Sequence, residues 1–333
     1  MSSIAAIPAQ QRRYDVHGVG LAVRAHAPVV LDAMELRLRD FRCADRPRAD
    51  VLLQFTADAS DPSPFAAGAG RPVYDTPFGT LYYVPEADAL HGELAGVQLH
   101  CEAARGLATL SSAAFAGRDL YLATHPLATI ALMELLERRG LFSLHAACLA
   151  GVDGRGVLIA GPSGSGKSTL ALALARAGMA FLSDDLVLLA AHPRSDWVRA
   201  LGFADAVGLT PYAAERFPEL SAALDVPPDD GFPKRLRRIE ELFGGAAPSS
   251  SSCEPSALVF PHVAPEEPCR LEPLDPREAL LRLVPDVLAT EPHATQAHLA
   301  AIGALLRQVR CYAFVSGGDL ERGAALVRGL VDG

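Results

Sequence analysis

Long apolar runs are missing from this sequence. No stretch approaches the roughly 18 uncharged apolar residues that a membrane-spanning helix needs. The first residues, MSSIAAIPAQQRR, also lack the apolar core of a signal peptide. These absences predict a cytoplasmic protein that neither crosses nor binds a membrane.

Basic charge is scarce as well. The formal net charge is −9 at pH 7, and the one locally basic run is KRLRR at residues 234–238. Proteins that bind nucleic acids without sequence preference need a broad basic surface. We therefore expect no nucleic-acid partner.

Cysteines at metal-binding spacing are absent. Six cysteines are spread between residues 43 and 311, and no two stand in a C-x-x-C arrangement. The pattern indicates neither a disulfide framework nor a zinc site. We interpret the cysteines as reduced thiols, several of them in the core.

The length and apolar content of the chain indicate how many domains to expect. With 333 residues and 50% hydrophobic content, the chain can bury a large core and should form about two domains. Residues 28–41 have a helical pattern, and short strand-like segments between residues 73 and 111 suggest an antiparallel meander. We predict a smaller α+β domain at residues 1–140, with an accessory or substrate-recruiting function, and a second domain at residues 141–333.

One motif in the second half is specific. Residues 161–169, GPSGSGKST, match Gly-x-x-x-x-Gly-Lys-[Ser/Thr] at every fixed position, which is the Walker A pattern of a phosphate-binding loop. The apolar run GVLIA precedes the loop and the helix-forming run LALALAR follows it, so strand, loop and helix come in the expected order. Glycines let backbone N–H groups turn inward, and the helix N-terminus adds partial positive charge. The segment is predicted to bind the phosphates of a nucleotide.

Two side chains of this loop have predictable roles. Lys167 would reach the β and γ phosphates of ATP, and the Ser168 hydroxyl would ligate Mg²⁺. ATP and Mg²⁺ are therefore the expected cofactors. The predicted nucleotide-binding residues are Gly161, Pro162, Ser163, Gly164, Ser165, Gly166, Lys167, Ser168 and Thr169.

Further candidate residues flank the loop. The segment LHAACLAGVDGRGVLIAG reads as two strands joined by an Asp-Gly turn at residues 153–154, and it carries His145 toward the phosphate end. Asp184 and Asp185 follow the next predicted strand at its carboxyl end, where ligands bind in open α/β sheets. One carboxylate could hold Mg²⁺ and the other accept a proton from an attacking hydroxyl. Alternatively, the two aspartates only cap a turn.

This succession of histidine-bearing strand, hairpin, Walker A loop, short helix and Asp-Asp pair resembles the catalytic domain of HPr kinase/phosphorylase over residues 141–190. Asp185 follows Lys167 by eighteen residues, as in that family, and His145 precedes the lysine by nearly the family's distance. The resemblance implies a P-loop kinase domain of the HPr kinase C-terminal type, with an α/β fold, preceded by the smaller α+β domain. It also implies that Asp185 accepts the proton, that Asp184 supports Mg²⁺, and that His145 orients the aspartate or contacts a phosphate.

The chain departs from that family downstream. It lacks the Arg-Gly-Leu-Gly signature, and the second Mg²⁺-binding acid cannot be placed. The chain is therefore more similar to HPr-kinase-related proteins, which include kinases of a serine in a biosynthetic precursor peptide and kinases of free serine. Lys234 and Arg235, at a predicted loop-to-helix junction, could stabilise the transferring phosphoryl group. Alternatively, they form only the solvated start of a helix.

Together these patterns predict an ATP-dependent kinase of a hydroxyl, with serine in a peptide or small protein favoured as acceptor over free serine. A metabolite kinase of the shikimate or gluconate type also places aspartates after the P-loop helix, but it lacks the upstream hairpin with His145. Outside enzymes, the alternative is a nucleotide-sensing module that has lost turnover. A homo-oligomer is compatible with the pattern.

Overall fold

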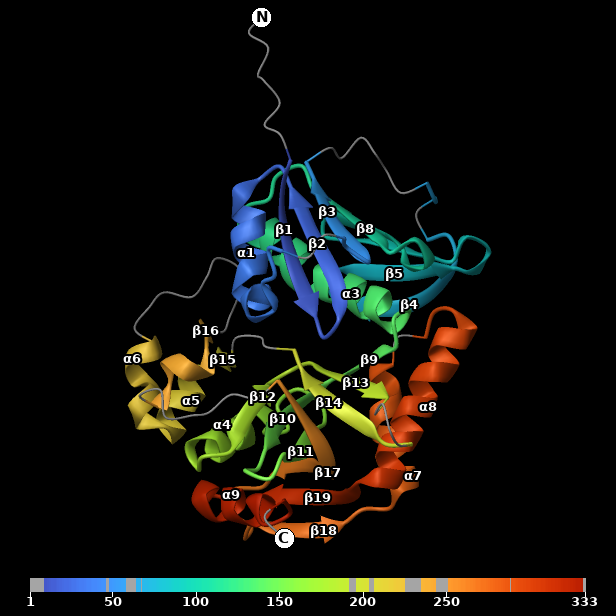
Figure 1. The fold of residues 1–333 in the computed structure, drawn as a ribbon. Coiled ribbons are helices and arrows are strands. Elements are labelled where there is room, and N and C mark those ends of the chain that lie inside the picture. Colours follow the sequence, from blue (N-terminus) through green and yellow to red (C-terminus); the bar gives the residue numbers. More distant parts are fainter. Residues whose placement is uncertain are drawn as a thin grey trace, which may run out of the picture. The chain divides into compact units, whose positions relative to one another are not determined.

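A computed structural model describes residues 9–45, 48–57, 64–66, 68–191, 196–203, 207–224, 235–243, 251–287 and 289–331. The chain divides into two compact units (Figure 1): unit 1 comprises Met1–Arg139 and Leu288–Thr295, and unit 2 comprises Gly140–Val287 and Gln296–Gly333. Both units combine strands with helices, so the predicted α/β content is confirmed. The sequence predicts a second domain over residues 141–333, and in the structure Leu288–Thr295 groups with unit 1.

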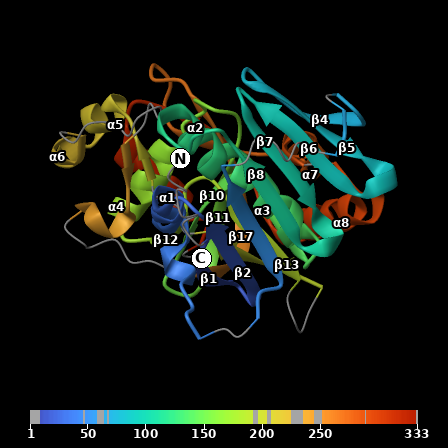
Figure 2. The same ribbon diagram turned by 90° about the horizontal axis from the view of Figure 1, so that it is seen from above.

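Unit 1 is built on an eight-stranded sheet in the order β1-β2-β3-β8-β7-β6-β5-β4. Its strands are β1 (Gln10–Val16), β2 (Val19–Ala25), β3 (Val51–Thr56), β4 (Arg71–Thr76), β5 (Gly79–Val84), β6 (Ala89–Leu94), β7 (Val97–Glu102) and β8 (Leu107–Ser111). β3 runs parallel to β2 and β8. Each strand from β4 to β8 is antiparallel to the next (Figure 2), so the predicted meander is confirmed.

One face of this sheet carries the core of unit 1. Residues alternate between the two faces of a strand, and on β3 the side chains of Val51, Leu53 and Phe55 are buried.

The helices of the unit are α1 (Pro28–Leu38), α2 (Gly117–Leu122) and α3 (Ala128–Glu137). A π-helical turn that contains Pro126 joins α2 to α3, because proline has no N–H to continue the regular helical bonds.

A buried polar cluster includes the C-terminal segment of unit 1. Glu134 on α3 is 1% exposed. The Thr290 hydroxyl lies 3.0 and 2.9 Å from its carboxylate oxygens, and Arg138 pairs with it at 2.7 Å. Arg138 also contacts Asp88 at 2.9 Å and Glu291 at 3.6 Å. Burial raises the pKa of the Glu134 carboxyl to about 7, although Arg138 and Thr290 favour its ionised form.

Unit 2 contains a nine-stranded sheet whose main path is β12-β10-β11-β17-β14-β13-β9, with β19 beside β17 and β18 beside β19. Its strands are β9 (Leu141–Leu144), β10 (Ala146–Ala150), β11 (Arg155–Ala160), β12 (Ala180–Ser183), β13 (Val187–Ala191), β14 (Val198–Gly202), β17 (Ser252–Val263), β18 (Arg270–Pro273) and β19 (Arg310–Ser316). β17 runs parallel to β11 and β19. β10 and β11 are antiparallel neighbours, so the predicted hairpin is confirmed.

Two apolar layers cover the sheet of unit 2. Its helices are α4 (Lys167–Arg176), α5 (Pro211–Arg216), α6 (Ser221–Leu224), α7 (Pro276–Leu283), α9 (Leu320–Arg328) and, from Gln296 on, α8 (Pro292–Gln308). Leu149 and Ile159 belong to the buried cluster that contains residues of α4 and α9, whereas Cys148 and Leu158 belong to the cluster with residues of α7 and α8. This alternation gives a sheet with helices on both faces, and it places the Walker A strand β11 inside the sheet.

The helices and the cysteines of the described residues bear on two expectations from the sequence, which are the absence of a membrane span and the reduced state of the thiols. Among the described residues, no helix is long and apolar enough to cross a membrane. All six cysteines are free thiols, and every one except Cys43 is buried.

Candidate active site

The Walker A loop lies between β11 and α4, as its pattern predicts. β11 ends at Ala160, and α4 begins at Lys167. Gly161, Gly164 and Gly166 have φ values of +143°, +81° and +101°, in the region that residues with a side chain rarely adopt. A Cβ added at Gly166 would lie 3.0 Å from Cγ2 of Val263, at the end of β17. The backbone can therefore take this path only because these positions are glycine.

The polar side chains of Lys167 and Ser165 in the loop bear on phosphate binding. Lys167 is 8% exposed, and its ammonium donates hydrogen bonds to the carbonyl oxygens of Gly161, at 2.6 Å, and Pro162, at 3.2 Å. Oγ of Ser165 is buried and has no hydrogen-bond partner among the described residues. A buried hydroxyl without a partner costs free energy, and a phosphate oxygen in the loop would supply the partner. The loop therefore fits an anion such as a nucleotide phosphate.

Strand pairing brings the other predicted residues to the same edge of the sheet. β10 lies between β11 and β12. Ala146, the first residue of β10, pairs with Ala160, the last residue of β11, so His145 lies beside the start of the Walker A loop. Cys148 pairs with Ser183, the last residue of β12, which places the following Asp-Asp pair at this edge as well.

His145 and Asp185 are in contact. Nδ1 of His145 lies 3.3 Å from Oδ1 of Asp185, and the two side chains are 40% and 54% exposed. A carboxylate that is held by an imidazole and still open to solvent can accept a proton from an incoming group. The contact places an imidazole beside an exposed carboxylate at the edge of the sheet that carries the Walker A loop.

Asp184 has a different environment. It is 7% exposed, and it follows Ser183, the fully buried last residue of β12. The Ser183 hydroxyl lies within hydrogen-bond distance of two carbonyl oxygens, that of Leu186 at 2.7 Å and that of Phe203 at 3.1 Å. These contacts stabilise the turn that carries both aspartates. One aspartate is thus held inside the protein while the next faces solvent.

Comparisons with known proteins add little to this geometry. No protein-family model matches the chain, and no curated protein has a matching sequence. Among solved structures, the chain is similar to the Hpr(Ser) kinase/phosphatase from Coxiella burnetii, with 16% sequence identity and a TM-score of 0.30 over 57% of this chain and 88% of that chain. A likeness this weak supports no conclusion about fold or activity. The geometry of the loop and of the His145–Asp185 pair has to support any assignment.

Ser168 and Asp184 are the residues that the sequence predicts to hold Mg²⁺. Ser168 is half-buried in the first turn of α4, and Asp184 is buried at the end of β12. Their hydroxyl and carboxylate oxygens are ligands of the kind that Mg²⁺ prefers. Among the described residues, no group of three or more His, Cys, Asp or Glu side chains could hold a metal ion. Mg²⁺ commonly takes one or two carboxylates together with substrate phosphates and water, so a site shared with a nucleotide needs no such group.

The basic run downstream does not fold as predicted. Lys234 lies outside the described residues. Arg235 is the first residue of β16 (Arg235–Arg237), which pairs with β15 (Val207–Leu209) as a two-stranded sheet. The loop-to-helix placement of Arg235 is therefore wrong, because strand pairing overrides the helical propensity of this short run. A role of either cation in stabilising the phosphoryl group stays a prediction.

Sequence reasoning missed two residues beside the site. Ser183 had a usable signal, since a serine next to a polar turn often bonds to nearby backbone groups. Val263, which packs against Gly166, had none, because only the pairing of β17 with β11 brings it to the loop.

Proposed function

We propose that unit 2 is an ATP- and Mg²⁺-dependent kinase that transfers the γ-phosphoryl group to a hydroxyl, and that the acceptor is a serine of a precursor peptide or small protein. The observation that supports this best is the 3.3 Å contact between Nδ1 of His145 and Oδ1 of Asp185, at the sheet edge that also carries the Walker A loop. Many nucleotide-binding proteins have such a loop. An exposed carboxylate beside it adds a group that can take a proton.

In the proposed reaction, the acceptor oxygen forms a bond to the γ-phosphorus while the bond between that phosphorus and the β–γ bridging oxygen breaks, which leaves ADP. Asp185 accepts the proton of the acceptor hydroxyl and releases it to solvent, to which it is open. His145 holds the carboxylate in its orientation. Asp185 suits this role better than Asp184, because a peptide or protein acceptor can reach only an exposed group.

The loop would bind the phosphates. Its backbone N–H groups and the start of α4 would face the anion, and the Lys167 ammonium would exchange its carbonyl partners for phosphate oxygens. When bound, Mg²⁺ neutralises charge on the phosphates, and Ser168 and Asp184 would hold it. In phosphoryl transfer, a protein contributes mainly by holding such positive groups in position before the reaction, where they stabilise the negative charge of the transition state.

The test is to incubate the protein with labelled ATP, Mg²⁺ and, in parallel, precursor peptides, small HPr-like proteins and free serine. The wild type should label a serine hydroxyl. Lys167→Ala should lose nucleotide binding and transfer, and Asp185→Asn should keep nucleotide binding while transfer falls about 10²- to 10⁴-fold. Asp153→Asn is the control, because it also replaces an aspartate by asparagine but lies in the turn between β10 and β11. It should behave like the wild type.

Other outcomes would point to other functions. Labelling of free serine alone would replace the polypeptide acceptor with a small molecule. ATP binding that depends on Lys167, with no label on any acceptor, would indicate a nucleotide-sensing module. Unchanged transfer by Lys167→Ala would remove the basis of the proposal.

A further inference from the structure

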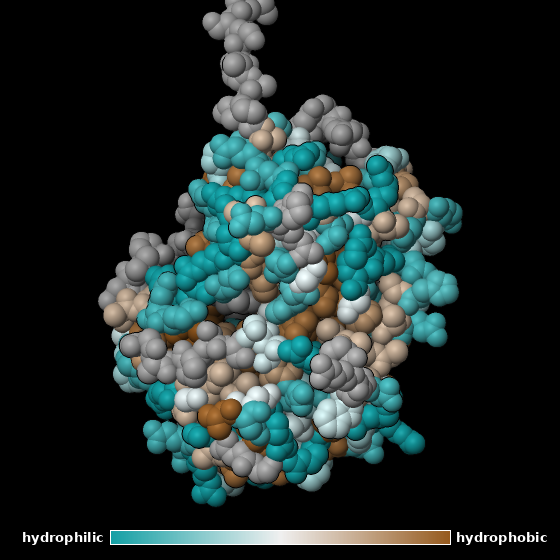
Figure 3. Space-filling model, viewed as in Figure 1, coloured by the Kyte–Doolittle hydropathy of each residue, from teal (hydrophilic) through white to brown (hydrophobic). Residues whose placement is uncertain are grey.

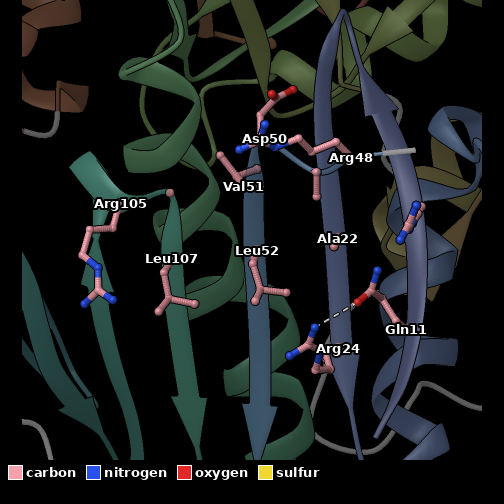
Figure 4. A pocket seen from close by; sticks show the side chains of 12 residues that line it. Gln11, Ala22, Arg24, Arg48, Asp50, Val51, Leu52, Arg105 and Leu107 are labelled. Atoms are coloured by element: carbon pink, nitrogen blue, oxygen red, sulfur yellow. Dashed lines mark hydrogen bonds between the residues drawn. The ribbon is translucent and has the colours of Figure 1, made fainter. Parts of the chain in front are cut away.

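The sheet face of unit 1 opposite its core carries a row of side chains that line a surface pocket. Strand pairing lines up one residue from each of four neighbouring strands. Across the sheet, these are Arg13 on β1, Ala22 on β2, Leu52 on β3 and Leu107 on β8. Residues two apart on a strand share a face, so Arg24 on β2 belongs to the same face. Figure 4 shows Leu52 and Leu107 side by side, between Arg24 and Arg105.

These residues line an open pocket with a volume of about 460 Å³. Its floor is apolar, from Ala22, Leu52 and Leu107. Arginines surround the floor: Arg13, Arg24, Arg48 and Arg105. We name this pocket the arginine-rimmed face. Figure 3, which views unit 1 from the side of β1 and β2, shows mainly hydrophilic side chains there, with hydrophobic atoms between them.

The charge of the arginine-rimmed face is unusual for this chain. The whole protein has a formal net charge of −9, yet among the described residues that line the pocket Asp50 is the only acidic one. Two of these arginines have partners but stay exposed: Arg24 donates to Gln11 at 3.2 Å, and Arg105 donates to both carboxylate oxygens of Glu102, at 3.0 and 2.8 Å, while its side chain is 70% exposed. Exposed ion pairs contribute little to stability, so an anionic ligand can compete for these guanidinium groups.

The dimensions of the surface indicate which ligand it would take. The four strands β1, β2, β3 and β8 span three interstrand spacings, or about 14 Å at ~4.8 Å each. A single phosphate or carboxylate is small beside this span and would meet only one part of the rim. A chain segment with several carboxylates can meet more than one arginine, and an apolar side chain between them can rest on Leu52 and Leu107.

We propose that the arginine-rimmed face is a docking site for an acidic polypeptide segment with interspersed apolar residues, and that this segment belongs to the protein or peptide that unit 2 phosphorylates. The second part rests on the proposed kinase function. Docking itself does not, because it uses unit 1 residues alone.

The test uses a short fluorescein-labelled peptide of alternating Glu and Leu, with fluorescence anisotropy measured on the full-length protein without nucleotide. The peptide should bind, and its affinity should fall as salt is added, because salt screens exposed charges. A Lys-for-Glu peptide should bind at least about tenfold more weakly, since like charges oppose docking. A Gly-for-Leu peptide tests the apolar floor and should also bind more weakly.

Protein variants locate the site. Arg24→Glu combined with Arg105→Glu should weaken binding of the acidic peptide about tenfold or more and leave ATP binding unchanged. Arg118→Glu combined with Arg39→Glu is the matched control, because it also reverses two arginines of unit 1, and both lie outside the pocket: Arg118 is 63% exposed beside Asp119, and Arg39 is 46% exposed beside Asp40. This double variant should bind the peptide like the wild type. Equal loss in both proteins would reduce the effect to overall charge and would overturn the proposal.

Further outcomes separate the ligand classes and the two proposals. Displacement of the peptide by an equal concentration of inorganic phosphate would show a small-anion site instead, and tighter binding of a DNA oligonucleotide would show a nucleic-acid surface; either overturns the proposal. If the acidic peptide docks at Arg24 and Arg105 but the wild type transfers no phosphoryl group, the docking proposal is supported and the proposed kinase function is wrong. If transfer occurs, the double variant should raise the KM of a peptide acceptor and leave kcat unchanged.

Discussion

Replacing Glu134 by glutamine should change how the stability of unit 1 depends on pH. The carboxyl of Glu134 is buried, and its pKa is raised from 4.5 to about 7. Between pH 4.5 and about pH 7, the Glu134 carboxyl is therefore protonated in the folded state and ionised in the unfolded state. The contribution of Glu134 is fully present below pH 4.5 and is lost as the pH rises through about 7.

The size of this effect follows from the two pKa values. The difference between 4.5 and about 7, at about 1.36 kcal/mol per pKa unit, amounts to about 3 kcal/mol. Glutamine matches the protonated carboxyl in shape and carries no charge. Glu134→Gln should therefore resemble the wild type near pH 4.5 and exceed its free energy of unfolding by about 3 kcal/mol near pH 8.5.

Amide hydrogen exchange in peptides from α3 and β8 measures this quantity in unit 1, at a series of pH values. The single tryptophan, Trp197, lies in unit 2, so its fluorescence would follow the wrong unit. Glu86→Gln, at an exposed glutamate of unit 1, is the control and should leave the pH profile as it is in the wild type. If the profiles of Glu134→Gln and the wild type stay parallel from pH 4.5 to 8.5, the raised pKa is wrong.

The remaining predictions concern the nucleotide site. Asp185→Asn should slow phosphoryl transfer about 10²- to 10⁴-fold at unchanged ATP affinity, and a rate within a few-fold of the wild type in a single-turnover assay would reject Asp185 as the base. His145→Ala should have a smaller effect in the same assay, because His145 only orients the carboxylate at 3.3 Å; a loss as large as that of Asp185→Asn would instead mean direct contact with substrate. Gly166→Ala should weaken ATP binding in calorimetry, since φ is +101° and the new Cβ would lie 3.0 Å from Val263. A smaller side chain at Val263 should not rescue it fully, because the strained φ, which costs about 1–2 kcal/mol, would persist.

Features that depend on neighbouring residues could be predicted from the sequence. The Walker A loop is a run of consecutive residues whose glycines and lysine specify their own backbone path, and it lies between β11 and α4 as expected. The hairpin of β10 and β11 follows from the Asp-Gly turn between them. The meander from β4 to β8 likewise joins strands that are adjacent in the chain. The run KRLRR is the exception, because its pairing with β15 depends on a segment that lies well before it in the chain.

Only the tertiary structure decided which distant residues meet. The sequence places His145 and Asp185 on either side of the Walker A loop, but the order β12-β10-β11 brings them within 3.3 Å. Segment 289–295 pairs with Glu134 through Thr290, although it lies far beyond the first domain in the sequence. The arginine-rimmed face needs four strands in one register, and its residues come from separate parts of unit 1. Contacts of this kind depend on the burial of a shared core, which no single stretch of the chain specifies.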